Sequence, residues 1–198
     1  MQNLLDLSVD NSAHWTMCAQ LYLKGFPPKE RDSLDNMRKR FKKGHFKIYY
    51  DVCEQNQVRV MGVVYALKTL EAVLLEYFVV REDFRRQGLA QAFLQALYDG
   101  VLSGKKALLL EVVNPEFSQT KAKELAKIAL FERFGAVLCP QIHFELPFVE
   151  NGQKQAMRLL CKHSVHTQLT ELDLQKALDE IFAEIYTPIV IEAELPKS

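Results

Sequence analysis

The stretch REDFRRQGLAQAFL, residues 81–94, decides how the rest of the chain is interpreted. It places Arg85, Arg86 and Gln87 directly before Gly88 and then continues into a run of good helix formers. The first amides of a helix have no partner within it, and the helix dipole adds about half a positive charge at that end. A glycine there lets a ligand approach the main chain closely. The stretch therefore predicts a turn and helix start that bind an anion such as phosphate.

Two known phosphate-binding motifs do not fit this turn. It lacks the Gly-Lys-Ser/Thr of a nucleoside triphosphate loop, and its single glycine does not make the GxGxxG pattern of dinucleotide-binding proteins. Taken alone, the turn is equally compatible with a surface loop that carries two solvated arginines.

Composition limits the class of protein. The chain has 198 residues, 48% hydrophobic and 25% charged, as in a globular protein with one sizeable domain. Its 25 basic and 25 acidic residues cancel, so we expect neither nucleic acid nor a membrane as a partner. The four cysteines are far apart and predict no metal site. No secretory signal pattern or apolar run of about 20 residues is present, which favours a cytoplasmic protein.

The segments before the turn predict two helices and then an antiparallel meander. Residues 11–23 favour a helix, and Ser33 is a suitable N-cap for a second helix whose last turns are basic. Three β-rich runs follow, at 45–54, 56–68 and 71–80.

The segments after the turn predict alternating helices and strands. They are a helix to about Ser103, a buried strand at 105–113, a helix at 120–134 ended by Gly135, a hairpin turning at Asn151-Gly152, and an amphipathic helix at 170–186. The expected fold class is α/β, with a mixed, largely antiparallel central sheet, flanking helices, and a C-terminal extension made of a hairpin and a helix.

The turn in this context resembles a known cofactor loop. Arg85-x-x-Gly88-x-Ala90, after the third strand of a meander, resembles the acyl-CoA pyrophosphate loop of the GNAT N-acetyltransferase superfamily. ALLLEVVNP at 107–115 and ALFERFGAVL at 129–138 resemble the strand and the helix that follow in that family. The resemblance implies a GNAT-like core at residues 1–140, completed or extended by residues 141–198.

The resemblance also implies acetyl-CoA as the acyl donor, with no metal. The expected cofactor-binding residues are Phe78, Val79 and Val80, along which the pantetheine arm would pair with the main chain, and Arg85, Arg86, Gln87, Gly88, Leu89 and Ala90, around the pyrophosphate.

The implied activity is an N-acetyltransferase that passes the acetyl group to a primary amine of a small molecule or peptide within a ternary complex. Glu76 and Glu111 are the candidate bases. By alternation Glu76 shares a face of its strand with Phe78 and Val80, beside the expected thioester, and is slightly preferred. Glu111 interrupts an apolar strand, where an unpaired carboxylate is unfavourable. An LEV glutamate is the base in members that acetylate protein N-termini. Either carboxylate could instead be a structural partner.

One position departs from the family pattern. Phe131 stands where the family often has a tyrosine that donates a proton to the CoA sulfur. Tyr77, Tyr98 or a water could take that role, and a thiol with an ordinary pKa of about 8.5 is a fair leaving group. The departure keeps open a non-catalytic acyl-CoA-binding or regulatory protein. A structural module, or a homodimer, that uses the apolar stripe of the last helix is a third interpretation.

The segment NPEFSQTKAKELAK, residues 114–127, is longer than its counterpart in the family. It predicts either a longer helix or a loop on the substrate side.

Overall fold

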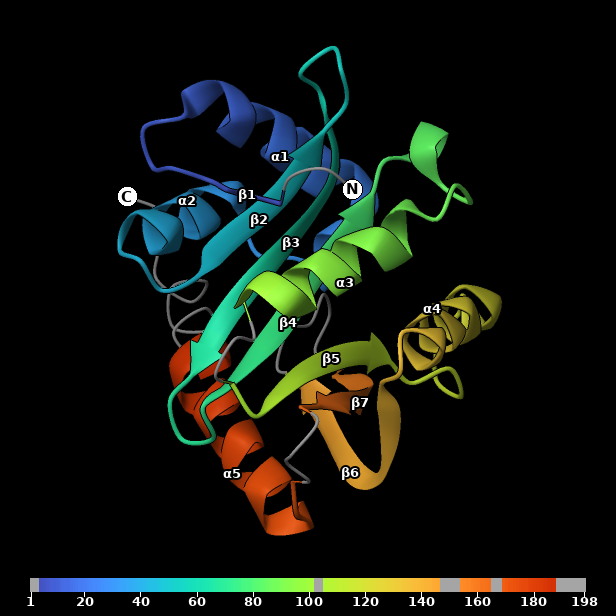
Figure 1. Ribbon diagram of the computed structural model, residues 1–198. Helices are drawn as coiled ribbons and strands as arrows, with labels where there is room; N and C mark the ends of the chain where they lie inside the picture. Colours follow the sequence, from blue (N-terminus) through green and yellow to red (C-terminus); the bar gives the residue numbers. More distant parts are fainter. Residues whose placement is uncertain (1–3, 102–104, 147–153, 165–168, 188–198) are drawn as a thin grey trace. The chain divides into compact units, whose positions relative to one another are not determined.

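The computed structural model describes residues 4–101, 105–146, 154–164 and 169–187 (Figure 1). The chain divides into two compact units. The first contains Met1–Ala66 and Leu75–Ser103, and the second contains Leu67–Leu74 and Gly104–Ser198. Each unit is built around its own antiparallel strands.

The first unit has strands in the order β1-β2-β3-β4, apart from the last residue of β3 and the first three of β4, which belong to the segment Leu67–Leu74 of the second unit. These are β1 (Leu5–Asp6), β2 (Lys47–Val52), β3 (Val58–Leu67) and β4 (Ala72–Val80). Its helices are α1 (Ser12–Gly25), α2 (Leu34–Lys42) and α3 (Leu89–Val101), with short 3-10 helices η1 (Pro28–Glu30) and η2 (Glu82–Phe84). The helices α1 and α2 lie on one face of β2, β3 and β4, and α3 lies on the other (Figure 1). The two predicted helices and the three predicted strands are confirmed.

Local sequence explains where these helices begin. The Asn11 side chain accepts a hydrogen bond from the His14 amide (3.0 Å) at the start of α1. Ser33 Oγ accepts one from the Asn36 amide (3.2 Å) at the start of α2, as predicted. The two-residue strand β1 was not predicted, because a strand that short has no period to detect.

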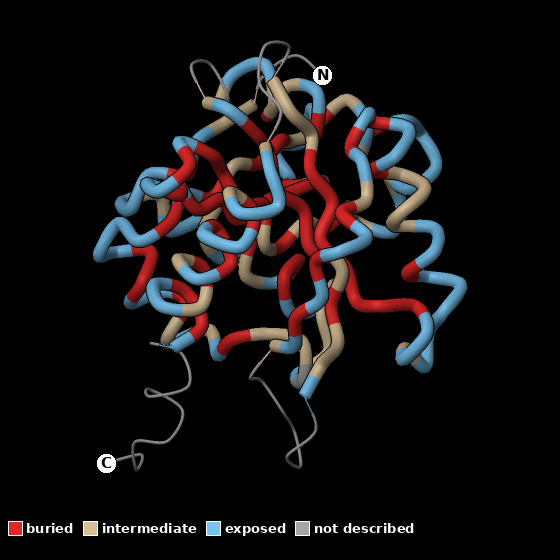
Figure 2. The backbone as a smooth tube through the Cα atoms, turned by 90° about the horizontal axis from the view of Figure 1, so that it is seen from below, coloured by how far each residue is buried: buried red, intermediate tan, exposed pale blue. Residues whose placement is uncertain are grey.

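The second unit has strands in the order β5-β7-β6, each antiparallel to its neighbour. They are β5 (Ala107–Val113), β6 (Val137–Leu146) and β7 (Gln155–His163). Its helices are α4 (Lys121–Arg133) and α5 (Glu171–Ile181), and α5 continues into the π-helical turn η4 (Phe182–Tyr186). Every residue of β5 is buried, as expected of a strand covered on both faces. Figure 2 shows the buried stretches of the backbone in red and the exposed ones in pale blue. The predicted turn at Asn151-Gly152 and the predicted helix end near Ser103 lie outside the described residues.

The helix α4 ends as predicted at Gly135. This glycine has a φ of +91°, and its amide donates to the Glu132 carbonyl (2.8 Å). Lys162 on β7 donates from Nζ to the Phe134 carbonyl (2.5 Å), a favourable place for a cation at a helix C-terminus. These bonds attach the end of α4 to one face of β7.

The helix α5 is fixed at both ends. Thr170 and Asp173 form a reciprocal capping box, with the Asp173 amide 3.2 Å from Thr170 Oγ1 and the Thr170 amide 2.9 Å from Asp173 Oδ2. Near the other end, the Glu180 carboxylate accepts the amides of Lys68 (2.7 Å) and Thr69 (2.8 Å) in the β3–β4 turn. Leu174, Leu178 and Ile181 are buried, so the apolar stripe of this helix packs within the chain.

The expected fold class, α/β with a mixed sheet, flanking helices and a C-terminal hairpin and helix, is confirmed. The expected division after residue 140 falls within β6 and stays a prediction. None of the helices in the described part of the chain is long and apolar enough to cross a bilayer.

The capping box predicts a measurable contribution to stability. Thr170→Ala removes the side-chain oxygen that accepts the Asp173 amide, and we expect the free energy of unfolding to fall by about 1 kcal/mol. Thr170→Ser keeps the hydroxyl and should stay within about 0.5 kcal/mol of the wild type. Urea unfolding of the three proteins measures the difference. Equal losses in both variants would contradict the role of the cap.

Candidate functional site

The predicted anion-binding turn lies between β4 and α3. After η2, the Arg85 amide donates to the Glu82 carbonyl (3.1 Å). Arg86 and Gly88 then adopt left-handed backbone angles, with φ of +61° and +76°. A glycine tolerates this conformation, whereas it costs an arginine about 1–2 kcal/mol. Strained residues of this kind concentrate at functional sites, which makes the turn a candidate site in its own right.

Side chains of the turn form hydrogen bonds that hold its backbone in place. The Arg81 guanidinium donates to both carboxylate oxygens of Asp83 (2.7 and 2.9 Å) and to Gln57 Oε1 (2.8 Å). Arg85 Nε donates to the Val80 carbonyl (3.1 Å), and Gln87 Nε2 donates to the Asp83 carbonyl (2.9 Å). The side chains of Arg85 and Gln87, two of the expected cofactor-binding residues, therefore hold the backbone of the turn in place. The sequence did not single out Arg81, although it directly follows the strand.

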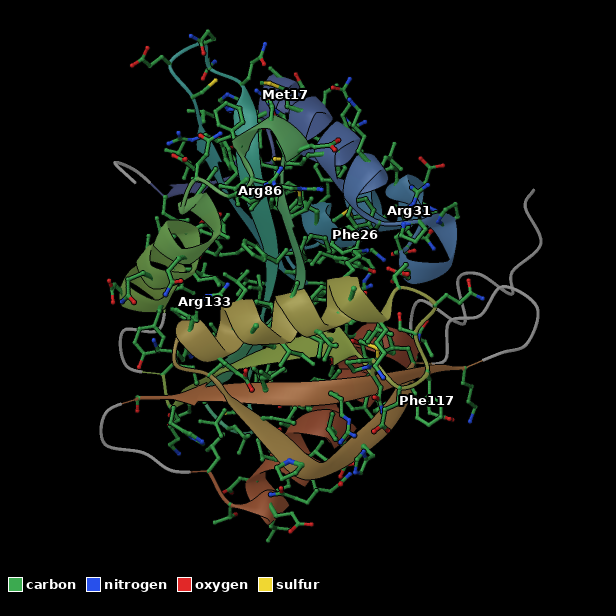
Figure 3. The ribbon with its side chains drawn as sticks, turned by 90° about the vertical axis from the view of Figure 1, so that its right-hand side faces the viewer. Met17, Phe26, Arg31, Arg86, Phe117 and Arg133 are labelled. Carbon is green, nitrogen blue, oxygen red and sulfur yellow. The ribbon has the colours of Figure 1, made fainter. Side chains whose placement is uncertain are left out.

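The turn is unobstructed around Gly88. A Cβ atom built on Gly88 would meet no other heavy atom within 4 Å, and Arg86, Gln87 and Gly88 are exposed. The Gly88 carbonyl accepts the Ala92 amide (3.0 Å), so the helix begins at this residue. The amides of its first turn have no partner inside the helix. Exposed amides, a helix N-terminus and an unobstructed glycine together fit a pyrophosphate. Arg86 lies beside this end of α3 in Figure 3.

The strand β4 does not alternate regularly. A Cβ built on Gly62 would lie 2.8 Å from Leu75 Cδ1 and 3.2 Å from Phe93 of α3, so Leu75 points toward α3. The Phe78 ring also stacks on Phe93, with ring centroids 5.6 Å apart. Residues three apart on a regular strand point to opposite faces, so the alternation breaks between Leu75 and Phe78.

Glu76 points to the other face of the strands. It forms a side-chain hydrogen bond with Tyr65. The guanidinium of the buried Arg40 of α2 lies over the Tyr65 ring, 5.5 Å from its centroid. Figure 3 shows α3 and the pair α1 and α2 on opposite sides of these strands. The expectation that Glu76 shares a face with Phe78 is therefore wrong, because the strand is irregular between them.

The environment of Glu76 is a buried polar cluster. Arg40 lies 3.8 Å from the Asp32 carboxylate, and the Tyr77 hydroxyl accepts a hydrogen bond from the Asp32 amide (3.4 Å). Burial, reinforced by the nearby Glu76 charge, raises the pKa of Tyr77 well above its ordinary value. Tyr77 is thus a poor proton donor. Tyr98, another candidate donor, is half-buried on α3.

The other predicted cofactor residues lie where the strand meets the turn. Val79 is buried and packs so closely on Gly25 of α1 that a Cβ there would lie 2.5 Å from Val79 Cγ2. The side chain of Leu89 is buried and anchors α3, while Ala90 is half-buried. Only their main-chain groups are suited to meet a ligand.

Glu111 occupies the middle of β5 in the second unit. It is 9% exposed, and its Oε2 accepts a hydrogen bond from the Tyr186 hydroxyl of η4. Its Oε1 has no hydrogen-bond partner among the described residues. Burial raises the pKa of Glu111 to about 7, and the Tyr186 hydrogen bond partly opposes that rise. A buried carboxyl that titrates near neutrality has the pKa expected of a general base.

Phe131 and Glu111 lie on opposite faces of the β5-β7-β6 strands. Glu111 is opposite Leu159 in the register, whereas Lys162, which binds the end of α4, is opposite Leu108. Because 159 and 162 differ by an odd number, their side chains point to opposite faces. The buried Phe131 belongs to α4 and therefore to the face away from Glu111.

The long segment 114–127 forms a loop and the first turns of α4. In it, Glu124 is buried and ion-paired with Lys127 (3.0 Å). Phe117 is largely exposed. Within the described residues, no group of three or more histidine, cysteine or acidic side chains could hold a metal ion.

Comparison with known proteins shows the family of the chain. The model of the acetyltransferase (GNAT) family matches residues 15–136, and the chain belongs to that family. A search of curated proteins found no match.

Solved structures share the fold at low sequence identity. A GNAT-family structure from Bacteroides thetaiotaomicron has a TM-score of 0.75 at 17% identity, covering 93% of this chain and 98% of that one. The ribosomal-protein-S18-alanine N-acetyltransferase of Escherichia coli has a TM-score of 0.57 at 17% identity, covering 85% and 100%. A GNAT acetyltransferase from Elizabethkingia anophelis with acetyl-CoA bound has a TM-score of 0.56 at 15% identity, covering 82% and 97%.

The raised pKa of Glu111 predicts a specific pH dependence of stability. Burial raises the pKa from 4.5 to about 7, so the folded protein retains a proton that the unfolded chain releases. Stability from this group is fully present below pH 4.5 and is lost as the pH rises to about 7. We expect Glu111→Gln to remove this loss. The free energy of unfolding of the variant minus that of the wild type should therefore increase by up to roughly 3 kcal/mol between pH 4.5 and about 8.

Urea unfolding at a series of pH values measures this difference. Glu184→Gln removes an exposed carboxylate on η4, the turn that carries Tyr186, and controls for a simple change of charge. A constant difference between Glu111→Gln and the wild type at all pH values would contradict a raised pKa.

Proposed function

We propose that the protein is an acetyl-CoA-dependent N-acetyltransferase that acts on a primary amine of a small molecule or a peptide. The observation that carries the proposal is the turn before α3, in which a strained arginine and an unobstructed glycine expose main-chain amides at a helix N-terminus. Membership of the GNAT family supports acetyl transfer as the reaction class.

In this proposal the donor is held mainly by the backbone. The amides of residues 86–90 bind the pyrophosphate, and the main chain of residues 78–80 pairs with the pantetheine arm. Arg81, Arg85 and Gln87 keep the turn in shape through their bonds to Asp83 and Val80. Binding would therefore depend on the conformation of the turn more than on any one side chain.

We assign the role of base to Glu111 rather than to Glu76. The carboxyl of Glu111 has a pKa near the working pH and an Oε1 with no hydrogen-bond partner among the described residues, whereas Glu76 is engaged with Tyr65 inside a polar cluster. A base of matched pKa is the more effective one. The position of Glu111 in an LEV sequence, the place of the base in related enzymes that acetylate protein N-termini, supports the same choice.

Bound acetyl-CoA would supply a thioester carbonyl. Glu111 takes a proton from the ammonium form of the acceptor, and the free amine then forms a bond to the carbonyl carbon while the C–S bond breaks. The sulfur leaves as a thiolate, and the second proton lost by the attacking nitrogen reaches this thiolate through water, since Phe131 has no hydroxyl and the pKa of Tyr77 is raised well above its ordinary value. The transfer is direct, within a ternary complex, and no covalent enzyme intermediate forms.

Binding of the donor tests the turn. We expect acetyl-CoA to bind with a Kd of roughly micromolar by titration calorimetry, and we expect Gly88→Trp to abolish the binding because the indole covers the amides. Gly44→Trp is the matched control: Gly44 has a φ of +74° and equally open space, but lies after α2. Absence of binding to the wild type, or equal loss in both variants, would refute the assignment of the turn.

Acetyl transfer tests the base. With an amine substrate found by screening CoA release, we expect Glu111→Gln to lower kcat/KM by about 10²–10⁴-fold and to leave acetyl-CoA affinity unchanged. Glu76→Gln should have a smaller effect on kcat/KM. The reverse order would make Glu76 the base. Tight acetyl-CoA binding without turnover of any amine would instead support the non-catalytic alternative, and parallel initial-rate lines would exclude direct transfer.

A further inference from the structure

The residue that binds Glu111 comes from the C-terminal extension. Tyr186 ends η4, a π-helical turn closed by the Thr187 amide on the Phe182 carbonyl. Single π turns inside α-helices are rare and are frequent at functional sites. Here the turn buries the adjacent Ile185 and Tyr186, which are 2% and 1% exposed, while residues 183, 184 and 187 remain exposed. The π turn thus delivers a tyrosine hydroxyl into the unit's interior.

The surroundings of Glu111 leave Tyr186 as its one polar contact within the described part of this unit. On the same face of the strands lie Ala107, Leu109 and Val113 of β5 and Met157, Leu159, Cys161 and His163 of β7. Two of these are titratable: burial raises the pKa of the Cys161 thiol to about 12, so it is neutral at physiological pH, and His163 lies at the end of β7 opposite Ala107, where its Nδ1 accepts the Leu169 amide (3.3 Å). The charged Arg158 and Lys162 of β7 point to the opposite face, away from Glu111.

The two oxygens of Glu111 are therefore not equivalent. Oε2 accepts the Tyr186 hydroxyl, whereas Oε1 is buried without a hydrogen-bond partner in the described residues. A carboxylate held by one oxygen has a fixed plane, and its other oxygen has a fixed direction. Buried polar atoms are rarely left unsatisfied unless a ligand, a water or a reaction uses them.

We propose that Tyr186 is a positioning residue for the base: its hydroxyl holds Oε2 of Glu111, so that Oε1 takes the proton from the acceptor amine. This inference rests on the proposed function. It gives the C-terminal extension a part in the chemistry, because the extension supplies the group that orients and tunes a carboxylate of the family core.

A purely structural role for Tyr186 makes a different prediction. The ring of Phe182 packs against both Phe144 of β6 (6.1 Å between centroids) and Tyr186 (5.6 Å), so the π turn also stabilises the unit. Loss of packing would lower stability at every pH. Loss of a hydrogen bond to an ionised carboxylate would instead raise the pKa of Glu111, because that bond favours the charged form.

Tyr186→Phe separates these roles, since it removes only the hydroxyl. We expect the acidic limb of the kcat/KM profile to move upward by about one pH unit, with kcat/KM roughly fivefold lower at the wild-type midpoint, about tenfold lower well below it, and recovery at higher pH. Titration of ¹³C-labelled glutamate side chains by NMR, with Glu111 assigned through Glu111→Gln, should show the same upward shift without any need for activity.

Two further variants complete the test. In the Glu111→Gln background, Tyr186→Phe should have no additional effect on kcat, because the hydroxyl acts through the carboxylate. Phe182→Leu disturbs the packing of the same turn without touching Glu111, and should lower stability while leaving the pH profile unchanged.

The outcomes distinguish this proposal from the proposed function. A less stable Tyr186→Phe with an unchanged pH profile and an unchanged Glu111 titration would overturn the positioning role. If no amine is acetylated by the wild type, the enzyme assignment fails, and the NMR titration alone decides whether Tyr186 tunes Glu111: an upward shift in Tyr186→Phe supports the pairing, and no shift refutes it.

Discussion

The first amides of a helix have no hydrogen-bond partner inside the helix. In this chain the turn before α3 determines what those amides can contact. Arg86 and Gly88 adopt left-handed backbone angles in this turn. Hydrogen bonds from the side chains of Arg81, Arg85 and Gln87 hold its backbone in place. The start of α3 is unobstructed at Gly88, where an added Cβ would meet no heavy atom within 4 Å. The strain at Arg86 is acceptable because several charge-assisted and carbonyl hydrogen bonds fix the same few residues.

A second constraint acts in the other unit, where a carboxyl lies within an apolar strand. Burial of Glu111 disfavours its charge, and a single hydroxyl from η4 partly offsets that effect. The outcome is a group poised between its two protonation states near neutral pH. Stability and the proposed reactivity are therefore linked at this residue, since the same burial that brings its pKa to the range suited to a base makes its ionised form unfavourable for folding.

Local patterns were sufficient for most of the elements and for the turn. Ser33, Gly135 and Thr170 mark helix ends through hydrogen bonds that involve only near neighbours in sequence, and the apolar run of β5 signals burial on both faces. The orientation of Glu76 was not predictable in this way. Its face depends on an irregularity in β4 that appears only through the packing of Leu75 and Phe78 on Phe93.

The sequence by itself determined the fold class, the position of the glycine turn and the absence of a hydroxyl at residue 131, because each follows from residue types at short spacing. Only the tertiary structure decided which of the two candidate carboxylates has a raised pKa, and which groups determine that pKa. Glu111 and Tyr186 are separated by 75 residues, and their hydrogen bond exists because the strand register and the π turn bring both side chains to one face. A pKa depends on that burial and that partner, and neither is a local property of the chain.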